Sequence, residues 1–387
     1  MRRGLTVALG IACIALALAA IQLGIGVRTD EAKYLLDIPY PHPPLARALL
    51  SMTDGWALQE QLWRIVFAML LVQSGWLAAA LADRRFPQER FALLCAWLGS
   101  AAVLLQAGTV MMAPLTAVLL LCLLWQVRRP SWSAGALGLL WLASLFTAYQ
   151  GVLALPLAWA ALRRGGASRA LTVGIVGVPL LLLALYTLTN PLAAAALLGR
   201  GSGSGAGQWP QALLLWGYAG SFLGSAIALW GLGRAHRAVL ASFALTLCYL
   251  LTSTPHEYYA VLLAPFAVYG LAHALEAVPG RWRGILIGVP CVGVALAAAT
   301  WREAQVHPAE ASAAALGAAG VQGTILLQEP FGHEWQYVLP NDILRYEPHL
   351  LPRAEAIVCP SACSAPSTWA DDWVALDGAP VDIWVRR

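Results

Sequence analysis

Long apolar runs constrain this chain more than any other feature. Runs of about 20 apolar residues recur through the first 300 positions, and about 20 residues are needed for a helix to cross the roughly 30 Å hydrocarbon core. Only 11% of the residues are charged and 59% are hydrophobic, whereas soluble domains carry about 25% charged residues. We therefore predict an α-helical polytopic membrane protein and exclude a soluble globular domain.

The apolar runs predict about eleven transmembrane helices. Their expected bounds are 4–27, 60–82, 91–108, 110–127, 134–148, 150–162, 170–188, 211–233, 238–252, 258–276 and 284–300. The segment 134–162 is short for two crossings, so it forms either two short helices or one re-entrant pair. The first run is long for a signal-peptide core and lacks a small-residue cleavage site, which favours a retained helix.

The arginines predict the orientation. If Arg2 and Arg3 face the cytoplasm, 14 of the 24 Lys and Arg residues share that side, as the positive-inside rule requires. The others in this group are Arg84, Arg85, Arg90, Arg128, Arg129, Arg163, Arg164, Arg169, Arg234, Arg237, Arg281 and Arg283. This distribution explains the net charge of +4, and no basic stripe indicates a nucleic-acid partner.

Two domains are expected, a multi-pass transmembrane domain over 1–300 and a small extracytoplasmic α/β domain over 301–387. In the second domain, β-prone runs occur at 323–328, 355–359, 372–376 and 381–386, and a helix is expected over 308–319. The Gly/Ser-rich stretch within 189–210 predicts a connector or a mobile lid. Cys359 and Cys363 lie close enough in sequence for a disulfide in an oxidising compartment, although sequence leaves their pairing open.

The first extracytoplasmic loop, 28–59, carries the candidate chemistry. Asp30 and Glu31 follow the first span directly, where partial desolvation suits a carboxylate to proton abstraction. Lys33, the only lysine in the chain, follows them and can hold a phosphate or neutralise the acids. Tyr34 and His42 come next. Taken singly, an acidic pair more often marks a solvated helix end than a catalytic site, and a histidine near prolines is more often a turn residue than a ligand.

A second candidate segment, TPHEYYAVLLAPFAVYG, opens the tenth predicted span. His256 and Tyr258 lie at its entrance, and Pro265 lies within the helix. An interfacial aromatic belt is the alternative explanation for these residues.

Together the two segments resemble the GT-C superfamily of membrane glycosyltransferases, in particular the branch of protein O-mannosyltransferases and lipid A aminoarabinose transferases. That branch has an Asp-Glu pair after the first helix, then a basic residue and Tyr, then a basic residue before Pro-Pro-Leu. Its late helix is entered by a basic residue and Tyr. The matching residues here are Asp30, Glu31, Lys33, Tyr34, His42, Pro43, Pro44, Leu45, His256, Tyr258, Tyr259 and Pro265.

The chain also departs from this pattern. Ala113 stands where members often have an acidic residue, and Tyr149 and Gln150 stand where a basic residue is frequent. These differences leave the acceptor class, the need for a divalent metal and catalytic activity itself open.

The resemblance implies an inverting glycosyltransferase that moves a sugar from a polyprenyl-phosphate donor to an acceptor hydroxyl on a lipid, glycan or protein. The reaction would take place at the outer face of a bacterial-type plasma membrane. Asp30 would be the general base and Glu31 would assist. The leaving phosphate would be bound by Lys33, Tyr34, His42, His256 and Tyr258. No cofactor is implied with certainty, and Asp30, Lys33 and His42 are expected to converge on one cavity.

Two other functions fit a helical membrane bundle. A transporter or lipid flippase is disfavoured because the predicted spans hold almost no acidic residue near their centres and no half is duplicated. A non-catalytic scaffold, whose tail recruits partners, is the other alternative.

Overall fold

The computed structural model describes residues 2–39, 41–194, 209–252, 256–278, 288–304, 306–329, 331–360, 372–376 and 378–386. The chain divides into two compact units. The helical unit comprises Met1–Ala19, Tyr40–Thr53 and Glu60–Glu303, and the sheet unit comprises Ala20–Pro39, Asp54–Gln59 and Ala304–Arg387. The glycine-rich stretch 199–208 lies outside the described residues.

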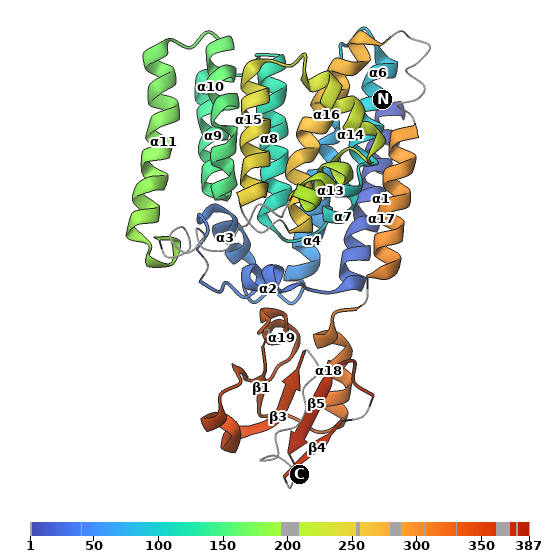
Figure 1. Ribbon diagram of the computed structural model, residues 1–387, viewed down its shortest axis with the longest axis vertical. Coiled ribbons are helices and arrows are strands. Elements are labelled where there is room, and N and C mark those ends of the chain that lie inside the picture. Colours follow the sequence, from blue (N-terminus) through green and yellow to red (C-terminus); the bar gives the residue numbers. More distant parts are fainter. Residues whose placement is uncertain are drawn as a thin grey trace. The chain divides into compact units, whose positions relative to one another are not determined.

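Most described residues of the helical unit form α-helices, and three short 3-10 turns lie among them (Figure 1). The last residues of α1, from Ala20, and Gln59 at the start of α4 belong to the sheet unit. The helices are α1 (Arg2–Ile25), α3 (Leu45–Leu50), α4 (Gln59–Gln73), α5 (Gly75–Ala80), α6 (Pro87–Leu98), α7 (Ala101–Gln106), α8 (Met112–Arg128), α9 (Ala134–Thr147), α10 (Leu155–Arg164), α11 (Arg169–Thr189), α13 (Trp209–Ala219), α14 (Leu223–Leu232), α15 (Arg237–Thr252), α16 (Ala260–Ala277) and α17 (Gly288–Glu303). The turns are η1 (Ser51–Thr53), η2 (Tyr149–Ala154) and η5 (Glu257–Tyr259).

The described helices include three that are long and apolar enough to cross a membrane, over Gln59–Ala80, Arg169–Thr189 and Glu257–Ala277. Two bent pairs raise this number to five if each pair is one span. The predicted eleven crossings are therefore not confirmed. One reason is length, because α9 has 14 residues and extends only about 21 Å at 1.5 Å per residue. The segment 134–162 forms two short helices, α9 and α10, joined by η2.

The predicted span 211–233 is wrong as a single straight helix, because α13 and α14 meet at 94°. Ser221 and Phe222 adopt positive φ values of 55° and 57° at the break. Backbone carbonyl groups that lose their helical hydrogen bonds inside a membrane need other partners. Serine hydroxyl groups supply them at this break. Ser225 Oγ donates to Trp216 O at 2.6 Å, and Ser100 Oγ donates to Ala219 O at 2.9 Å.

Helix α16 lies at the centre of the helical unit, and most of its residues are buried. It packs against α14 through glycines. A Cβ atom on Gly231 would lie 1.9 Å from Gly270 O, and a Cβ on Gly270 would lie 2.3 Å from Ala228 O. Such close backbone contact is typical of helix pairs in membranes. By contrast, α11 is at the edge of the unit (Figure 1).

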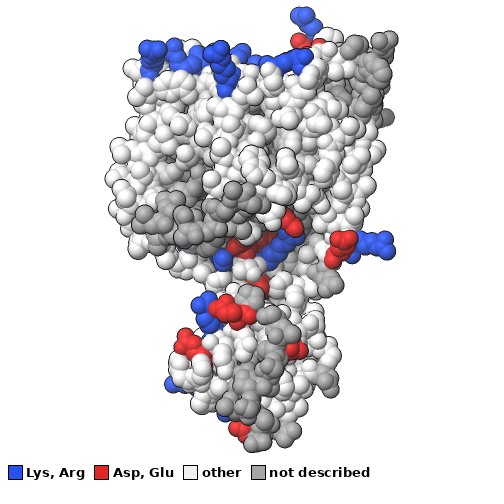
Figure 2. Space-filling model, viewed as in Figure 1, with Lys and Arg blue, Asp and Glu red and all other residues white. Residues whose placement is uncertain are grey.

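Lys and Arg side chains gather along one end of the helical unit (Figure 2). Arg128 ends α8, Arg164 ends α10 and Arg169 begins α11, so antiparallel helices bring their arginines to the same end. This agrees with the predicted alternation of basic loops. Arg281 and Arg283 lie outside the described residues.

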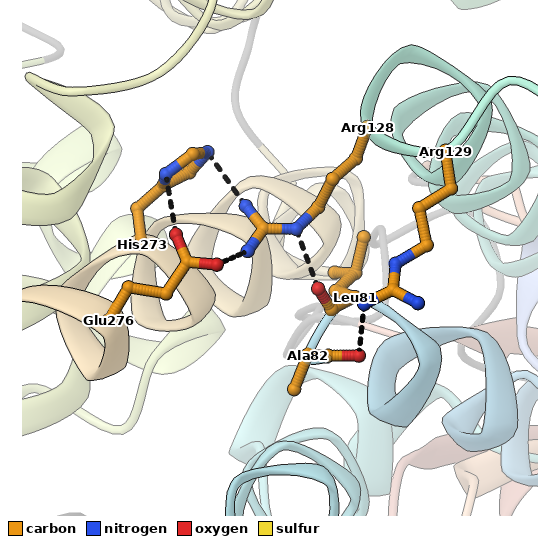
Figure 3. Close-up of polar contacts among 6 residues, drawn as sticks. All are labelled: Leu81, Ala82, Arg128, Arg129, His273 and Glu276. Atoms are coloured by element: carbon orange, nitrogen blue, oxygen red, sulfur yellow. Dashed lines mark hydrogen bonds and ion pairs between the residues drawn. The ribbon is translucent and has the colours of Figure 1, made fainter. Parts of the chain in front are cut away.

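At this end, Arg128 connects three segments of the helical unit (Figure 3). Its Nε donates to Leu81 O at 2.6 Å, its Nη1 lies 2.9 Å from His273 Nε2, and its Nη2 donates to the Glu276 carboxylate. Because a guanidinium only donates, His273 Nε2 accepts and Nδ1 carries the proton toward Glu276. This cluster stabilises the packing of α8 against α16.

The sheet unit contains a five-stranded mixed sheet in the order β2-β1-β3-β5-β4. Strand β1 pairs in parallel with β2 and β3, whereas β5 pairs antiparallel with β3 and β4. The elements are α2 (Thr29–Leu35), α18 (Pro308–Ala318), β1 (Thr324–Leu327), α19 (His333–Val338), β2 (Ile343–Arg345), η7 (Pro348–Arg353), β3 (Ala354–Cys359), β4 (Trp373–Ala375) and β5 (Asp382–Arg386).

All four predicted strands and the predicted helix of the tail, residues 301–387, are confirmed, but β2 and α19 were not predicted. Alternating residues of each strand build two cores. Ile325 and Leu327 pack with Trp335 of α19 on one face, whereas Leu326 and Ile357 pack on the other. Cys359 is disulfide-bonded, and its expected partner Cys363 lies outside the described residues.

Candidate functional site

The acidic motif forms a short helix, α2, where a loop was expected. It follows α1 after a 106° bend at Gly26, whose φ is +92°. Helical spacing divides the motif into two faces. Glu31 and Tyr34 are buried, whereas Asp30 and Lys33 have side chains that are 28% and 18% exposed.

Asp30 and Lys33 form an ion pair on the partly exposed face of α2. Lys33 Nζ lies 2.9 Å from Asp30 Oδ1, at the i,i+3 spacing of a helix. Both side chains keep access to solvent, so a carboxylate and an ammonium are presented together. The structure thus brings these two predicted site residues together.

Glu31 has a different environment from Asp30. It is fully buried, and its Oε2 accepts a hydrogen bond from Arg28 N at 3.1 Å. This bond satisfies a backbone donor at the start of α2, as in a capping box. The two carboxylates therefore differ in environment, because Glu31 is buried in a capping contact and Asp30 is partly exposed. The assisting role expected of Glu31 stays a prediction.

Three tail residues that the sequence analysis missed hold the start of α2. Glu310 Oε1 accepts from Val27 N at 3.2 Å, and the Glu334 carboxylate accepts from Thr29 Oγ1. His307 Nε2 lies 3.4 Å from the other Glu334 oxygen. Burial lowers the pKa of His307, although the nearby Glu334 and Glu310 carboxylates oppose this shift. No local sequence signal links these residues to the motif.

His42 belongs to the helical unit and is buried there. Its ring lies 6.0 Å from the Tyr149 ring, and its backbone oxygen accepts from Tyr186 Oη at 3.2 Å. Tyr149 occupies a position where the resemblance leads one to expect a basic residue. An aromatic ring therefore faces His42 there.

The second motif forms a cluster of tyrosines in the helical unit. The exposed His256 ring stacks on Tyr258 with 5.2 Å between centroids and an interplanar angle of 12°. Gln150 Nε2 donates to Tyr249 Oη at 2.8 Å and to Tyr259 Oη at 3.4 Å. Because Gln150 directly follows Tyr149 in η2, this turn connects the surroundings of His42 with the tyrosine cluster.

An apolar cavity of about 480 Å³ begins next to the Pro-Pro-Leu motif. It is bounded by α3 and α9 and lined by Pro44, Leu45, Ala48, Leu139, Leu142, Ala143 and Phe146. A cavity without polar lining groups suits hydrocarbon.

The predicted site residues are thus distributed over the two units. Asp30, Glu31, Lys33 and Tyr34 lie in the sheet unit, and His42, His256 and Tyr258 lie in the helical unit. Their convergence on one cavity stays a prediction. Among the described residues, no three His, Cys, Asp or Glu side chains form a group that fits a metal ion.

Comparison with solved structures finds similarity over the whole chain. ArnT from Cupriavidus metallidurans in the apo state matches with a TM-score of 0.66 and 13% identity, over 99% of this chain and 98% of that one. ArnT bound to undecaprenyl phosphate matches with a TM-score of 0.65 and 13% identity, over 98% and 97%. The arabinofuranosyltransferase AftD from Mycobacteria matches with a TM-score of 0.50 and 14% identity, over 100% of this chain and 40% of that one.

No protein-family model and no curated protein matches the sequence. The similarity therefore concerns the fold, and it extends through both units. The arrangement of helices followed by a small sheet is shared with these proteins. The chain therefore has the fold of ArnT, which agrees with the fold that the resemblance to the GT-C superfamily implied.

Proposed function

We propose that the protein is an inverting glycosyltransferase that moves a sugar from a polyprenyl-phosphate donor to an acceptor hydroxyl. The observation that carries the proposal is the partly exposed Asp30–Lys33 pair in α2, in a chain with the fold of ArnT. A carboxylate beside a cation offers a proton acceptor and a phosphate-binding group in one place. ArnT was solved with undecaprenyl phosphate, and AftD is an arabinofuranosyltransferase.

In the proposed reaction, Asp30 takes the proton of the acceptor hydroxyl. The acceptor oxygen forms a bond to the anomeric carbon as the bond from that carbon to the phosphate oxygen breaks. The phosphate leaves with the electron pair, and attack from the opposite side inverts the configuration. Lys33 stabilises the charge that develops on the leaving phosphate. Buried Glu31 caps α2 and would assist Asp30 by holding the helix that carries it.

The helical unit would bind the donor lipid. The cavity beside Pro44 and Leu45 has the apolar lining that a polyprenyl chain requires. His42, His256 and Tyr258 would contribute donors for the phosphate. We place the arginine-rich end of this unit on the cytoplasmic side of the plasma membrane, following the positive-inside rule, and the sheet unit on the outer side.

Asp30→Asn tests the proposal, with Asp37→Asn as the matched control. Asp37 lies just after α2, is exposed, and has a φ of 49° that asparagine tolerates. The assay uses native membranes and undecaprenyl phosphate that carries labelled mannose, arabinose or aminoarabinose, and it measures release of undecaprenyl phosphate. We expect the wild-type protein and Asp37→Asn to discharge one of these donors. Asp30→Asn should lose at least about 100-fold in kcat, because general base catalysis contributes roughly 10²–10⁴-fold.

Full activity of Asp30→Asn would refute the assignment of the base. If the wild-type protein binds the labelled donors without discharging any, the scaffold alternative is favoured. If it moves the intact donor across vesicle membranes, a flippase is favoured.

A further inference from the structure

The break between α1 and α2 is held by the start of α18 and by α19. His307 N donates to Ile25 O at 3.3 Å, Glu310 Oε1 accepts from Val27 N at 3.2 Å, and Thr29 Oγ1 donates to the Glu334 carboxylate. These contacts all lie within the sheet unit. The last of these contacts is made by Thr29, the residue directly before Asp30.

The tail residues that make these contacts are themselves fixed. Glu334 is buried and its second oxygen lies 3.4 Å from His307 Nε2. His307 Nδ1 accepts from Ala309 N at 3.2 Å and thereby caps α18. Its remaining ring proton is therefore on Nε2, directed at Glu334. The Glu310 carboxylate fills the space beside Gly26, where a Cβ atom would lie 2.3 Å from Glu310 Oε1.

Helix α2 depends on such contacts. It has only seven residues, and helices of this length do not form alone in water because nucleation is unfavourable. Its buried residues pack on α19, within the same unit. The helix that carries Asp30 is therefore held by groups that follow it by about 280 to 300 positions in the sequence.

We propose that Thr29, Glu310 and Glu334 are positioning residues that hold Asp30 in its productive orientation, so that the tail is part of the transferase site. This inference rests on the proposed function. A displacement of about 1 Å at a reacting group can lower the rate about 100-fold. Loss of one of these contacts should lower kcat much more than it changes KM for the donor.

The central test compares Thr29→Val with Thr29→Ser in the full-length protein. Valine has the shape of threonine but cannot donate to Glu334, whereas serine retains the donor. We expect kcat to fall about 10- to 100-fold for Thr29→Val, with KM for the labelled donor within about twofold of wild type, and serine to restore kcat. Glu334→Gln should behave like Thr29→Val.

Glu355→Gln is the matched control in the same unit. Glu355 accepts from Gln322 N at 2.9 Å and Gly323 N at 2.7 Å, and these contacts are made within the tail. A purely structural role of the tail predicts that Glu355→Gln and Glu334→Gln lower kcat equally. Our inference predicts that Glu355→Gln leaves kcat unchanged.

Wild-type kcat in both Thr29→Val and Glu334→Gln would overturn the inference while leaving the proposed function intact. Absence of donor discharge by the wild-type protein would instead refute the proposed function. If Glu334→Gln does not fold, the valine and serine variants decide the question. Equal kcat values for these two would then overturn the inference.

Discussion

The contact between α14 and α16 allows a sharp test of the fold. Gly231→Ala would place a Cβ atom 1.9 Å from the backbone oxygen of Gly270, whereas carbon and oxygen normally stay about 3.3 Å apart. A backbone oxygen cannot rotate away as a side chain can. The two helices must therefore separate by more than 1 Å.

The expected cost follows from this geometry. Overpacking typically destabilises by about 1–3 kcal/mol, and a clash with backbone belongs at the upper end of that range. Alanine recovers up to about 1 kcal/mol of helix propensity. We therefore expect Gly231→Ala to lower the free energy of unfolding by about 2 kcal/mol.

Gly174→Ala in α11 is the matched control, because a Cβ at Gly174 meets no atom within 4 Å. It should leave the free energy of unfolding unchanged or raise it by up to about 1 kcal/mol. Titration of the purified protein with SDS in detergent micelles, followed by tryptophan fluorescence, measures both variants. Equal stability of the two variants would show that α14 and α16 do not approach through these glycines.

Two further predictions concern charged groups. Arg128→Gln should destabilise the helical unit by about 2 kcal/mol, which is less than the loss of a fully buried pair because the Glu276 side chain is 50% exposed. Arg128→Lys should recover only part of this loss, and wild-type stability of Arg128→Gln in the same SDS titration would contradict the prediction. Because the pKa of His307 is lowered from 6.5, its neutral form contributes stability that is fully present above pH 6.5 and is lost as pH falls toward the folded-state pKa. His307→Asn keeps an acceptor for the Ala309 N–H but does not titrate. The fall in the free energy of unfolding between pH 7 and pH 5 should therefore be smaller in this variant than in the wild type. An unchanged pH dependence would exclude His307 as the source of that fall.

Local patterns in the sequence predicted much of this protein. The expected span 170–188 corresponds to α11, Arg169–Thr189, and the expected tail helix corresponds to α18, Pro308–Ala318. Apolar runs and alternating apolar residues reflect the surroundings of each segment in the folded protein, so predictions made from them agree with the structure. The short elements β2, α19 and α2 escaped prediction, because a few residues carry too little periodic signal and their stability comes from burial.

Tertiary structure decided what local patterns could not. The bend between α13 and α14 interrupts a continuous apolar run, and it is stabilised in part by Ser100, more than 100 positions earlier. Likewise, Val27 and Thr29 are bound by residues 283 and 305 positions away. Sequence alone identified Asp30 and Lys33 as a carboxylate and a cation at the end of a helix. Which groups hold them in place depends on chain segments that become neighbours only after folding, because hydrogen bonds act over a few ångströms of space regardless of distance along the chain.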